Sequence, residues 1–315
     1  MVIWDHIPEN RSEKIALCIG KFDGFHKGHR LLIEEAKETG FPVGVLTFLF
    51  HHTDTIDSVE EKRRLAEALG VDVYIEIEAG PSFFSLTPEG FIRDVVAEKL
   101  RAAHVIVGED FCFGRDRAGD VSTLAAYEER CHYRLHAIRK LRDREGEISS
   151  SRIRECILAG QMEDVTRMLG RAYPMTGVVT DGNHIGRRMG VPTANLIPEA
   201  GRVLPPRGVY AMWVTIDETE PERTDAKRKK KKKAGESDGR RRYRSIGNLG
   251  TKPTIGADNP LGLEIHLLDY EGDLYGKRIT AEFGTFLRKE RRFDDVESLH
   301  HQIDEDIRRA EKWLR

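Results

Sequence analysis

Two histidines stand in a glycine-rich segment near the start of the chain. The segment Gly20–His29 contains His26 and His29 in the pattern His-x-Gly-His, after an apolar run and before a helical pattern. Glycines at a strand-to-helix turn let the backbone approach a phosphate, and the first N–H groups of the helix point toward it. Paired histidines in a loop are often incidental, but this placement suits imidazoles that donate hydrogen bonds to a triphosphate as pyrophosphate leaves. The pattern predicts nucleotidyl transfer.

A second segment rich in hydroxyl groups, Ile148–Arg154, lies at the predicted start of a helix. Serine hydroxyls at a helix start cap the helix and can also bind phosphate, and an arginine one turn later adds positive charge. A plain N-cap is the ordinary interpretation of Ser149–Ser151, and a phosphate site is the alternative.

The third segment with chemical potential lies in the second half of the chain. Three glycines spaced four residues apart precede the segment Pro192–Asn195, and they are Gly182, Gly186 and Gly190. Such a loop can fold over phosphates with its backbone N–H groups pointing inward. Thr193 and Asn195 place two neutral oxygens within reach of one divalent cation, and Mg²⁺ prefers oxygen ligands that it shares with substrate phosphates. A single Gly-x-x-x-Gly often marks only a hairpin, but this longer pattern predicts a site for phosphate groups and a divalent cation.

The first half of the chain must place its segments on an α/β scaffold. Apolar strand patterns alternate with helical patterns up to about residue 170, and this alternation predicts a parallel sheet covered on both faces. The predicted strands are Ile15–Ile19, Val43–Phe48, Val71–Ile77 and Val105–Val107. The predicted helices are Arg30–Glu38, Glu60–Leu69, Phe91–Leu100, Ser149–Leu158 and Met162–Leu169.

After Tyr173 the pattern changes to strands and turns without intervening helices, which predicts an antiparallel, barrel-like fold. The strands that we identify are Thr176–Thr180, Val209–Ile216, Tyr243–Ile246 and Leu263–Leu268. A terminal helix with an apolar stripe from Val296 to Leu314 should pack on the barrel. We therefore expect domains at residues 1–172 and 173–315, with a polar, disordered insert at 217–242 that contains the basic run Lys227–Lys233.

Composition excludes several classes of protein. The chain has 315 residues, 39% hydrophobic and 33% charged, and a formal net charge of -2. No apolar run approaches the roughly 20 residues of a membrane span, and no export signal is visible. The four cysteines lack a Cys-x-x-Cys pair, which favours reduced thiols over disulfides or zinc. We expect a cytoplasmic protein with no membrane or nucleic-acid partner.

The segment Gly20–His29 resembles the signature of the bacterial bifunctional riboflavin kinase/FAD synthetase family, one of the HxGH nucleotidylyltransferases. The stretch Val107–Asp120 is similar to the family's second nucleotide and flavin loop, and Ile148–Arg154 is similar to its Ile-Ser-Ser-Thr-Arg-Ile-Arg segment. The resemblance implies that the first half adenylylates FMN with ATP, with His26 and His29 as catalytic residues and the flavin near Asp110 and Phe111. The implied ATP and phosphate contacts there are Gly20, Phe22, Asp23, Gly24, Gly28, Ser149, Ser150, Ser151 and Arg154.

The second half resembles riboflavin kinases more closely than the first half resembles FAD synthetases. The similar segments are Gly182–Asn195, Gly208–Ala211, Asn248–Thr254, Leu263–Asp269, Gly272–Gly276 and Phe286–Glu290, with Phe293. The resemblance implies Glu264 as the general base that takes the proton of the riboflavin hydroxyl. A solvent-facing glutamate on a half-buried strand would be the ordinary interpretation of that residue.

The same resemblance implies the ligands of the kinase half. Gly182, Gly186, Gly190 and Pro192 would bind ATP, and Thr193 and Asn195 would bind Mg²⁺. Asn248, Arg288 and Glu290 would bind the flavin, with Arg288 and Glu290 in a loop that closes over it. A surface ion pair is the ordinary interpretation of Arg288 and Glu290. The resemblance also implies that the antiparallel β-barrel has six strands. The expected partners are riboflavin, FMN and ATP, and the expected assembly is a monomer or a weak homo-oligomer.

The chain also departs from the family. Where the family has Phe-Asp-Pro-His-Pro, this sequence reads Phe48-Leu49-Phe50-His51-His52. One alternative is therefore a riboflavin kinase whose first half has become a flavin-binding or regulatory module. A second is an HxGH enzyme that acts on another phosphate. A third is a nucleic-acid-binding protein, suggested by Lys227–Lys233 but disfavoured by its acidic neighbours and its lack of aromatic residues.

Overall fold

The structure is a computed structural model that describes residues 1–9, 11–49, 54–78, 80–180, 193–217, 241–251 and 261–314. The chain divides into two compact units, Met1–Arg154 with Met168–Gly170 and Glu155–Arg167 with Arg171–Arg315. The expected functional domains 1–172 and 173–315 stay predictions, because the two compact units interleave between Arg154 and Arg171.

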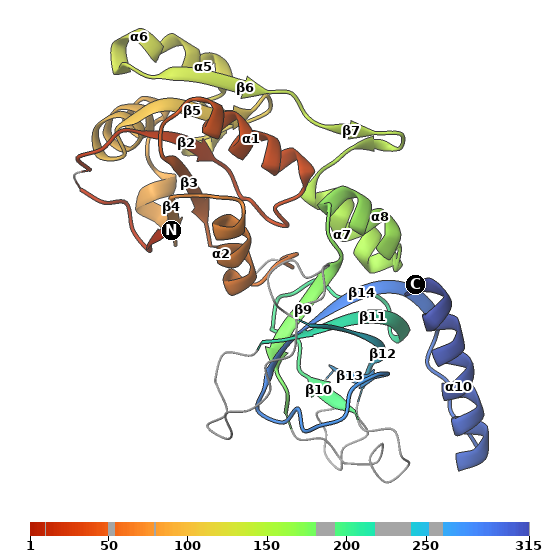
Figure 1. Cartoon of the computed structure of the whole chain (residues 1–315). Coiled ribbons are helices and arrows are strands. Elements are labelled where there is room, and N and C mark those ends of the chain that lie inside the picture. Colours follow the sequence, from red (N-terminus) through yellow and green to blue (C-terminus); the bar gives the residue numbers. More distant parts are fainter. Residues whose placement is uncertain are drawn as a thin grey trace, which may run out of the picture. The chain divides into compact units, whose positions relative to one another are not determined.

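The first unit is built on a sheet of six parallel strands in the order β1-β4-β3-β2-β5-β6 (Figure 1). The strands are β1 (Val2–Trp4), β2 (Ile15–Ile19), β3 (Val43–Phe48), β4 (Val73–Ile77), β5 (Ala102–Gly108) and β6 (Arg134–Ile138). The helices between them are α1 (Lys27–Glu38), α2 (Val59–Ala68), α3 (Pro81–Phe84), α4 (Pro88–Gly90), η1 (Phe91–Lys99), η2 (Arg115–Arg117), α5 (Val121–Ala126) and α6 (Glu128–Cys131). The doubly wound parallel sheet predicted from the alternating pattern is confirmed.

The two faces of the sheet are covered by different helices because successive strand residues point to opposite faces. One core cluster joins Ala16 and Cys18 of β2 to Ile33 of α1. The other cluster joins Leu17 of β2 to Ile92 of η1. Burial on both faces explains the nearly continuous apolar character of these strands.

A short hairpin and two helices complete this region of the chain. The hairpin is formed by β7 (Arg142–Asp143) and β8 (Gly146–Glu147), and the helices are α7 (Ser150–Ala159) and α8 (Met162–Leu169). The sequence predicted both helices but not the hairpin, nor β1, β6, α5 and α6. These shorter or half-exposed elements carry too few apolar residues to show a clear period.

The second unit contains an antiparallel sheet in the order β10-β13-β12-β11-β14-β9. Its strands are β9 (Tyr173–Val178), β10 (Ala194–Leu196), β11 (Gly208–Ile216), β12 (Arg242–Thr251), β13 (Leu261–Leu267) and β14 (Arg278–Arg288). Just after β9, Thr180 forms a bridge with Asn195 of β10 and donates its backbone N–H to the Asn195 carbonyl (3.0 Å). This contact brings the two edges together, so the predicted six-stranded barrel is confirmed.

The terminal helix α10 (Val296–Trp313) packs on one face of this sheet. Ala310 and Leu314 lie in a core cluster with Val209 and Ala211 of β11. The predicted packing of the apolar stripe is thus confirmed, except at Val296, whose side chain is exposed.

Three barrel predictions need correction. The strand predicted at Tyr243–Ile246 extends over the whole of β12, and the strand predicted at Thr176–Thr180 lies earlier in the chain, as β9. The strands β10 and β14 were not predicted. The predicted insert also begins too early, because Asp217 is buried and donates its backbone N–H to the Arg278 carbonyl. Arg242, predicted as its end, is the first residue of β12. Residues 218–240, with the basic run, lie outside the described residues.

Two candidate active sites

In the first unit the strand order reverses its direction at β2. From β2 the chain adds β3 and then β4 on one side, whereas β5 and β6 lie on the other side. At a point where the strand order reverses, the loops that follow the two neighbouring strands turn to opposite sides of the sheet. A crevice forms between these loops at the carboxyl ends of the strands, and ligands bind there. The segment after β2 is Gly20–His26, and the segment after β5 contains Asp110 and Phe111. The fold therefore brings two of the predicted segments to one edge of the sheet.

The two histidines of this site are stacked on each other at the start of α1. Their ring centroids are 3.7 Å apart, and His26 is the N-cap of the helix, with its Nδ1 accepting the backbone N–H of His29 at 3.3 Å. Because Nδ1 is the acceptor, the proton of a neutral His26 ring must lie on Nε2. His26 is thus left with one N–H that can donate to a substrate oxygen.

Both imidazoles are neutral at neutral pH. Burial lowers the pKa of His26 to about 4. Burial, then the neighbouring His26 and Lys62, holds the pKa of His29 well below its usual range. His29 Nδ1 is buried and has no hydrogen-bond partner among the described residues. Lys62 of α2 is 4% exposed and was not identified from the sequence, where it looks like one more charge on a helix surface.

The backbone of the segment Gly20–His29 follows a path that requires glycine. Gly24 has φ of +88°, and a Cβ there would lie 3.0 Å from the Ile56 side chain and 3.2 Å from that of Leu169. Phe22 and Phe25 on either side of Gly24 are fully buried, which anchors the turn. At Gly28 a Cβ would lie 3.1 Å from the His26 ring, so the absence of a side chain lets the imidazole rest against the backbone.

Asp23 contacts two other predicted ATP-binding residues, which lie far from it in the sequence. Arg154 pairs with the buried carboxylate of Asp23, Nη2 to Oδ2 at 2.5 Å. Ser150 Oγ donates to the backbone carbonyl of Asp23 at 2.8 Å. The start of α7 is therefore joined to the turn that carries the histidines.

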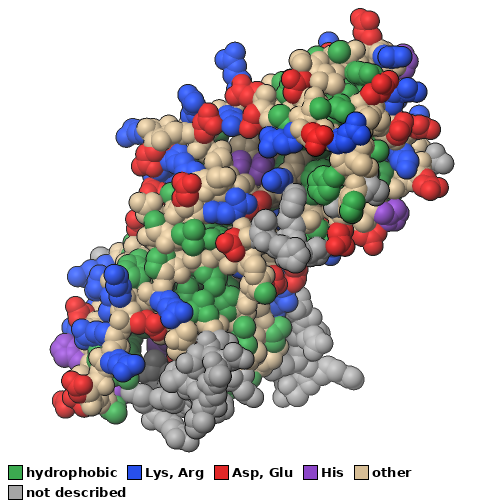
Figure 2. Space-filling view, turned by 180° about the vertical axis from the view of Figure 1, so that it is seen from behind, with side chains coloured by type: hydrophobic (Ala, Val, Ile, Leu, Met, Phe, Trp, Pro, Cys, Tyr) green, Lys and Arg blue, Asp and Glu red, His purple; other side chains and the backbone are tan. Residues whose placement is uncertain are grey.

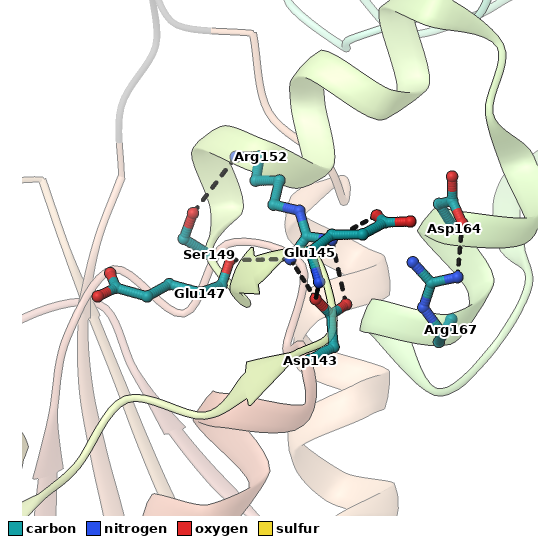
Figure 3. A network of polar contacts seen from close by, with 7 residues as sticks. All are labelled: Asp143, Glu145, Glu147, Ser149, Arg152, Asp164 and Arg167. Carbon is teal, nitrogen blue, oxygen red and sulfur yellow. Dashed lines mark hydrogen bonds and ion pairs between the residues drawn. The ribbon is translucent and has the colours of Figure 1, made fainter.

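The first turn of α7 is also held by the β7–β8 hairpin (Figure 3). Arg152 donates to both carboxylate oxygens of Asp143, at 2.7 and 3.1 Å, and to Glu145 at 2.8 Å. Ser149 Oγ accepts the backbone N–H of Arg152 at 3.3 Å, so Ser149 caps the helix as its ordinary interpretation expected. Ser151 is exposed.

The second loop of this unit follows β5. The Asp110 carboxylate forms an ion pair with Lys140 Nζ at 2.9 Å, and Phe111 stacks on Phe113 with ring centroids 5.5 Å apart. Of the segment that departs from the family pattern, Phe48 ends β3 and Leu49 donates its backbone N–H to the Ile77 carbonyl. Residues 50–52 lie outside the described residues.

In the barrel unit, three predicted site residues form a row across neighbouring strands. Glu264 of β13 is the register partner of Asn195 on β10 and of Asn248 on β12. Directly opposed residues in antiparallel strands have side chains on the same face, with Cβ atoms about 4.5–5.5 Å apart. Glu264 is half-buried between the buried residues Leu263 and Ile265, as alternation predicted. The carboxylate therefore lies on one face between two amides.

Both amides of this row present unpaired oxygens. Asn195 Oδ1 and Asn248 Oδ1 are buried and have no hydrogen-bond partner among the described residues. Asn248 Nδ2 donates to Glu290 Oε1 at 3.2 Å, which orients the amide. A buried carbonyl oxygen without a donor is costly unless a ligand completes it. A hard cation or a substrate N–H would do so.

The barrel site fits Mg²⁺ only in company with substrate. The described part of the chain holds no group of three or more His, Cys, Asp or Glu side chains that could bind a metal. The Asn195 oxygen and the half-buried Thr193, two residues earlier, supply neutral oxygen ligands. Such a donor set suits a magnesium ion that takes its remaining ligands from phosphates and water.

The placement of Arg288 corrects the loop expected to close over the flavin. Arg288 is the last residue of β14, and its guanidinium pairs with the buried Asp306 of α10, with Nε at 3.0 and 2.9 Å from the two oxygens. Glu290 does lie beyond the strand, and its carboxylate rests against Gly250, where a Cβ would collide with it. Whether Arg288 contacts a flavin stays a prediction.

Asp306 was not identified from the sequence, although its position in the helix carries a signal. Asp306 lies three residues after Ile303 and four before Ala310, inside the apolar stripe of α10. An acidic residue at such a position must be buried and therefore needs a cationic partner. Gly182, Gly186, Gly190 and Pro192 lie outside the described residues, so their predicted contacts with ATP stay predictions.

Comparison with known proteins gives matches over both halves. A riboflavin kinase family model matches residues 169–314, and an FAD synthetase family model matches residues 8–152. The bifunctional riboflavin kinase/FMN adenylyltransferase of Pseudomonas fluorescens is 31% identical over 96% of this chain and 93% of its own length. The enzyme of the same name from Bacillus subtilis is 29% identical over 98% of this chain and 95% of its own length.

A solved structure matches the whole chain as well. The crystal structure titled macrolide-efflux protein from Streptococcus pneumoniae has a TM-score of 0.83 and 25% identity, and the match covers 99% of this chain and 100% of that one.

Within the described residues, no helix has the length and apolar character needed to cross a membrane. Acidic and basic side chains are interspersed on the face drawn in Figure 2.

Proposed function

The chain belongs to the family of bifunctional riboflavin kinase/FMN adenylyltransferases, and from this premise we propose that it converts riboflavin to FMN and FMN to FAD. The resemblance recognised in the sequence is thus confirmed. Matches to both family models favour two activities over a riboflavin kinase with a degenerate first half. The observation that carries the proposal is the row of Asn195, Glu264 and Asn248, present in the same chain as the stacked histidines.

The kinase step takes place in the barrel unit. Glu264 accepts the proton of the riboflavin 5′-hydroxyl as that oxygen attacks the γ-phosphorus of ATP, the bond from the γ-phosphorus to the bridging β-phosphate oxygen breaks, and ADP leaves. Asn248 and Glu290 orient the flavin beside the base, because the Asn248 oxygen is left without a protein donor. Thr193 and Asn195 would hold Mg²⁺, which neutralises phosphate charge when it is bound with ATP.

The adenylyl transfer takes place in the first unit. A phosphate oxygen of FMN attacks the α-phosphorus of ATP, the bond to the β-phosphate oxygen breaks, and pyrophosphate leaves. His26 donates its Nε2 proton in a hydrogen bond to the triphosphate, and the first N–H groups of α1 add to the attraction. The lowered pKa of both rings means that they act as neutral donors before substrate binds.

The remaining expectations belong to the same proposal. The protein works in the cytoplasm, acts on riboflavin, FMN and ATP, and is a monomer or a weak homo-oligomer. The departure at Phe48–His52 is then a tolerated variation of the flavin-adenylylating site.

The test of the proposal is a substitution that separates the two steps. Glu264→Gln should abolish FMN formation from riboflavin and leave FAD formation from supplied FMN within about twofold of wild type, since the carboxylate acts only in proton transfer. Chromatographic product analysis distinguishes the outcomes. Equal loss of both activities would contradict a model with two separate sites.

A further inference from the structure

The Asp23 carboxylate in the first unit is fully engaged by the protein itself. The residue is 5% exposed, Oδ1 accepts the backbone N–H of Ile56 at 2.9 Å, and Oδ2 pairs with Arg154. A buried carboxylate whose two oxygens already have donors gains little from a further ligand, and a triphosphate would repel it. The predicted role of Asp23 as a direct ATP contact therefore fits its surroundings poorly.

Arg154 is engaged on one side only. Its Nε donates to the Asp54 carbonyl at 2.8 Å, and Nη2 donates to Asp23. A guanidinium carries five N–H donors. The other three have no partner among the described residues, and 28% of the side chain is exposed. Arg154 thus has a fixed side, which faces Asp23 and Asp54, and a free side that can bind a phosphate through parallel N–H donors.

The same acidic residue also joins two distant segments. Ser150 Oγ donates to the Asp23 carbonyl at 2.8 Å, and Ile56 packs where a side chain at Gly24 would lie. These contacts hold the start of α7 and the residues before α2 against the turn that leads to His26. Through these contacts, the helix start that carries Arg154 and the turn that leads to His26 are held together.

We infer that Asp23 is a positioning residue of the adenylyl-transfer site: it does not bind substrate but aims the free donors of Arg154 at the ATP phosphates. This inference rests on the proposed adenylyl transfer. Orienting a charged donor before substrate binds reduces the reorganisation needed in the transition state. A residue with this role acts only through Arg154, whereas a substrate ligand acts by itself.

A double-mutant cycle in the full-length chain tests the inference. We expect Asp23→Asn to lower kcat/KM for FAD formation from FMN about 10-fold, and Arg154→Ala to lower it about 100-fold. The double variant should stay within about twofold of Arg154→Ala, because Asp23 has nothing left to position. Losses that multiply to about 1000-fold would overturn the inference, since they would mean that Asp23 acts independently of Arg154.

Arg154→Lys provides a conservative variant. A single ammonium cannot hold the Asp23 carboxylate and the Asp54 carbonyl while it also donates to phosphate in parallel. The loss should therefore fall between those of wild type and Arg154→Ala, mainly in KM for ATP. Full activity in Arg154→Lys would overturn the inference, because the fixed geometry would then be unnecessary.

Arg152→Ala is the matched control for folding. Arg152 lies on the same helix and is ion-paired as well, but with the β7–β8 hairpin instead of the turn. The Arg152→Ala variant should lower the free energy of unfolding as much as Asp23→Asn does, but it should change the KM for ATP little. If FAD formation fell by the same factor in Arg152→Ala and Asp23→Asn, Asp23 would have a structural role only, and the inference would be overturned.

If the wild-type protein formed no FAD from FMN, the proposed adenylyl transfer would be contradicted, and the positioning role of Asp23 would be rejected with it.

Discussion

At the scale of single residues, burial decides the chemistry of the first site. The residue types at Gly20–His29 could be recognised in the sequence, but the protonation of the two imidazoles could not, because it depends on how deeply the turn is buried. Burial lowers the pKa of His26 to about 4, so the ring is a neutral donor at neutral pH. The sequence likewise could not show that Arg154 already pairs with Asp23.

The neutral state of His26 predicts a pH dependence of stability. The pKa of His26 lies below its unfolded value near 6.5, so the unfolded chain binds the proton more tightly. The contribution of neutral His26 to the free energy of unfolding is fully present above about pH 6.5. It is lost as the pH falls toward 4, and the loss amounts to up to about 3 kcal/mol. Denaturant unfolding at pH 7, 5.5 and 4 measures this loss.

His26→Asn supplies the comparison, because asparagine also caps a helix but does not titrate. The difference in unfolding free energy between wild type and His26→Asn should shrink as the pH falls from 7 to 4. A difference that stays constant over this range would mean that His26 has the same pKa in the folded and the unfolded protein, and would contradict the lowered pKa.

The turn before His26 predicts a sharp dependence on one glycine. Gly24→Ala places a Cβ at φ of +88° and in tight contact with Ile56 and Leu169. We expect a loss of about 1–3 kcal/mol in unfolding free energy, with reduced FAD formation. Gly40→Ala is the control, since Gly40 has φ of +78° but nothing within 4 Å of the added Cβ. Equal losses in the two variants would contradict the packing argument.

At the scale of elements, strong periodicity was predictive and weak periodicity was not. Val43–Phe48 and Met162–Leu169 lie where the sequence predicted them, because burial of a face imposes a clear pattern. The strand β14 was missed because half-exposed polar residues and Gly284 interrupt its alternation. Its register nevertheless sets the end of the strand at Arg288, which aligns with Val209 of β11.

The contact between β14 and α10 depends on one buried ion pair. Asp306 is 1% exposed and accepts from Arg288 and Gln302. Asp306→Ala would leave the Arg288 charge without its partner, which costs about 3–5 kcal/mol when such a pair is buried. The Arg288 side chain is 18% exposed, so water partly screens its charge, and we expect a loss in unfolding free energy of about 2–3 kcal/mol.

Asp306→Ala should also weaken riboflavin phosphorylation, because the end of β14 carries the chain toward Glu290. Asp304→Ala, on the exposed side of the same helix, is the control and should leave both quantities nearly unchanged. If the destabilised Asp306→Ala protein phosphorylated riboflavin as fast as wild type, the contact between β14 and α10 would not be needed for catalysis, and this prediction would be wrong.

At the scale of the whole molecule, each of the two compact units carries one of the two candidate sites. Alternation of strands and helices revealed the first unit, and the loss of helices after Tyr173 revealed the second. The sequence could name the residues of the barrel row, but only the strand register shows that Asn195 and Asn248 flank Glu264. Family membership then gives the order of the reactions, because the product of the barrel is the substrate of the first unit.

A product assay with the wild-type chain distinguishes an enzyme with two active units from a riboflavin kinase with an inactive first unit. Purified protein is incubated with Mg-ATP and either riboflavin or FMN, and the flavins are separated by chromatography. Two active sites predict FMN and then FAD from riboflavin, and FAD from FMN supplied alone. FMN that accumulates from riboflavin, with no FAD from either substrate, would contradict the account and leave a riboflavin kinase with an inactive first unit.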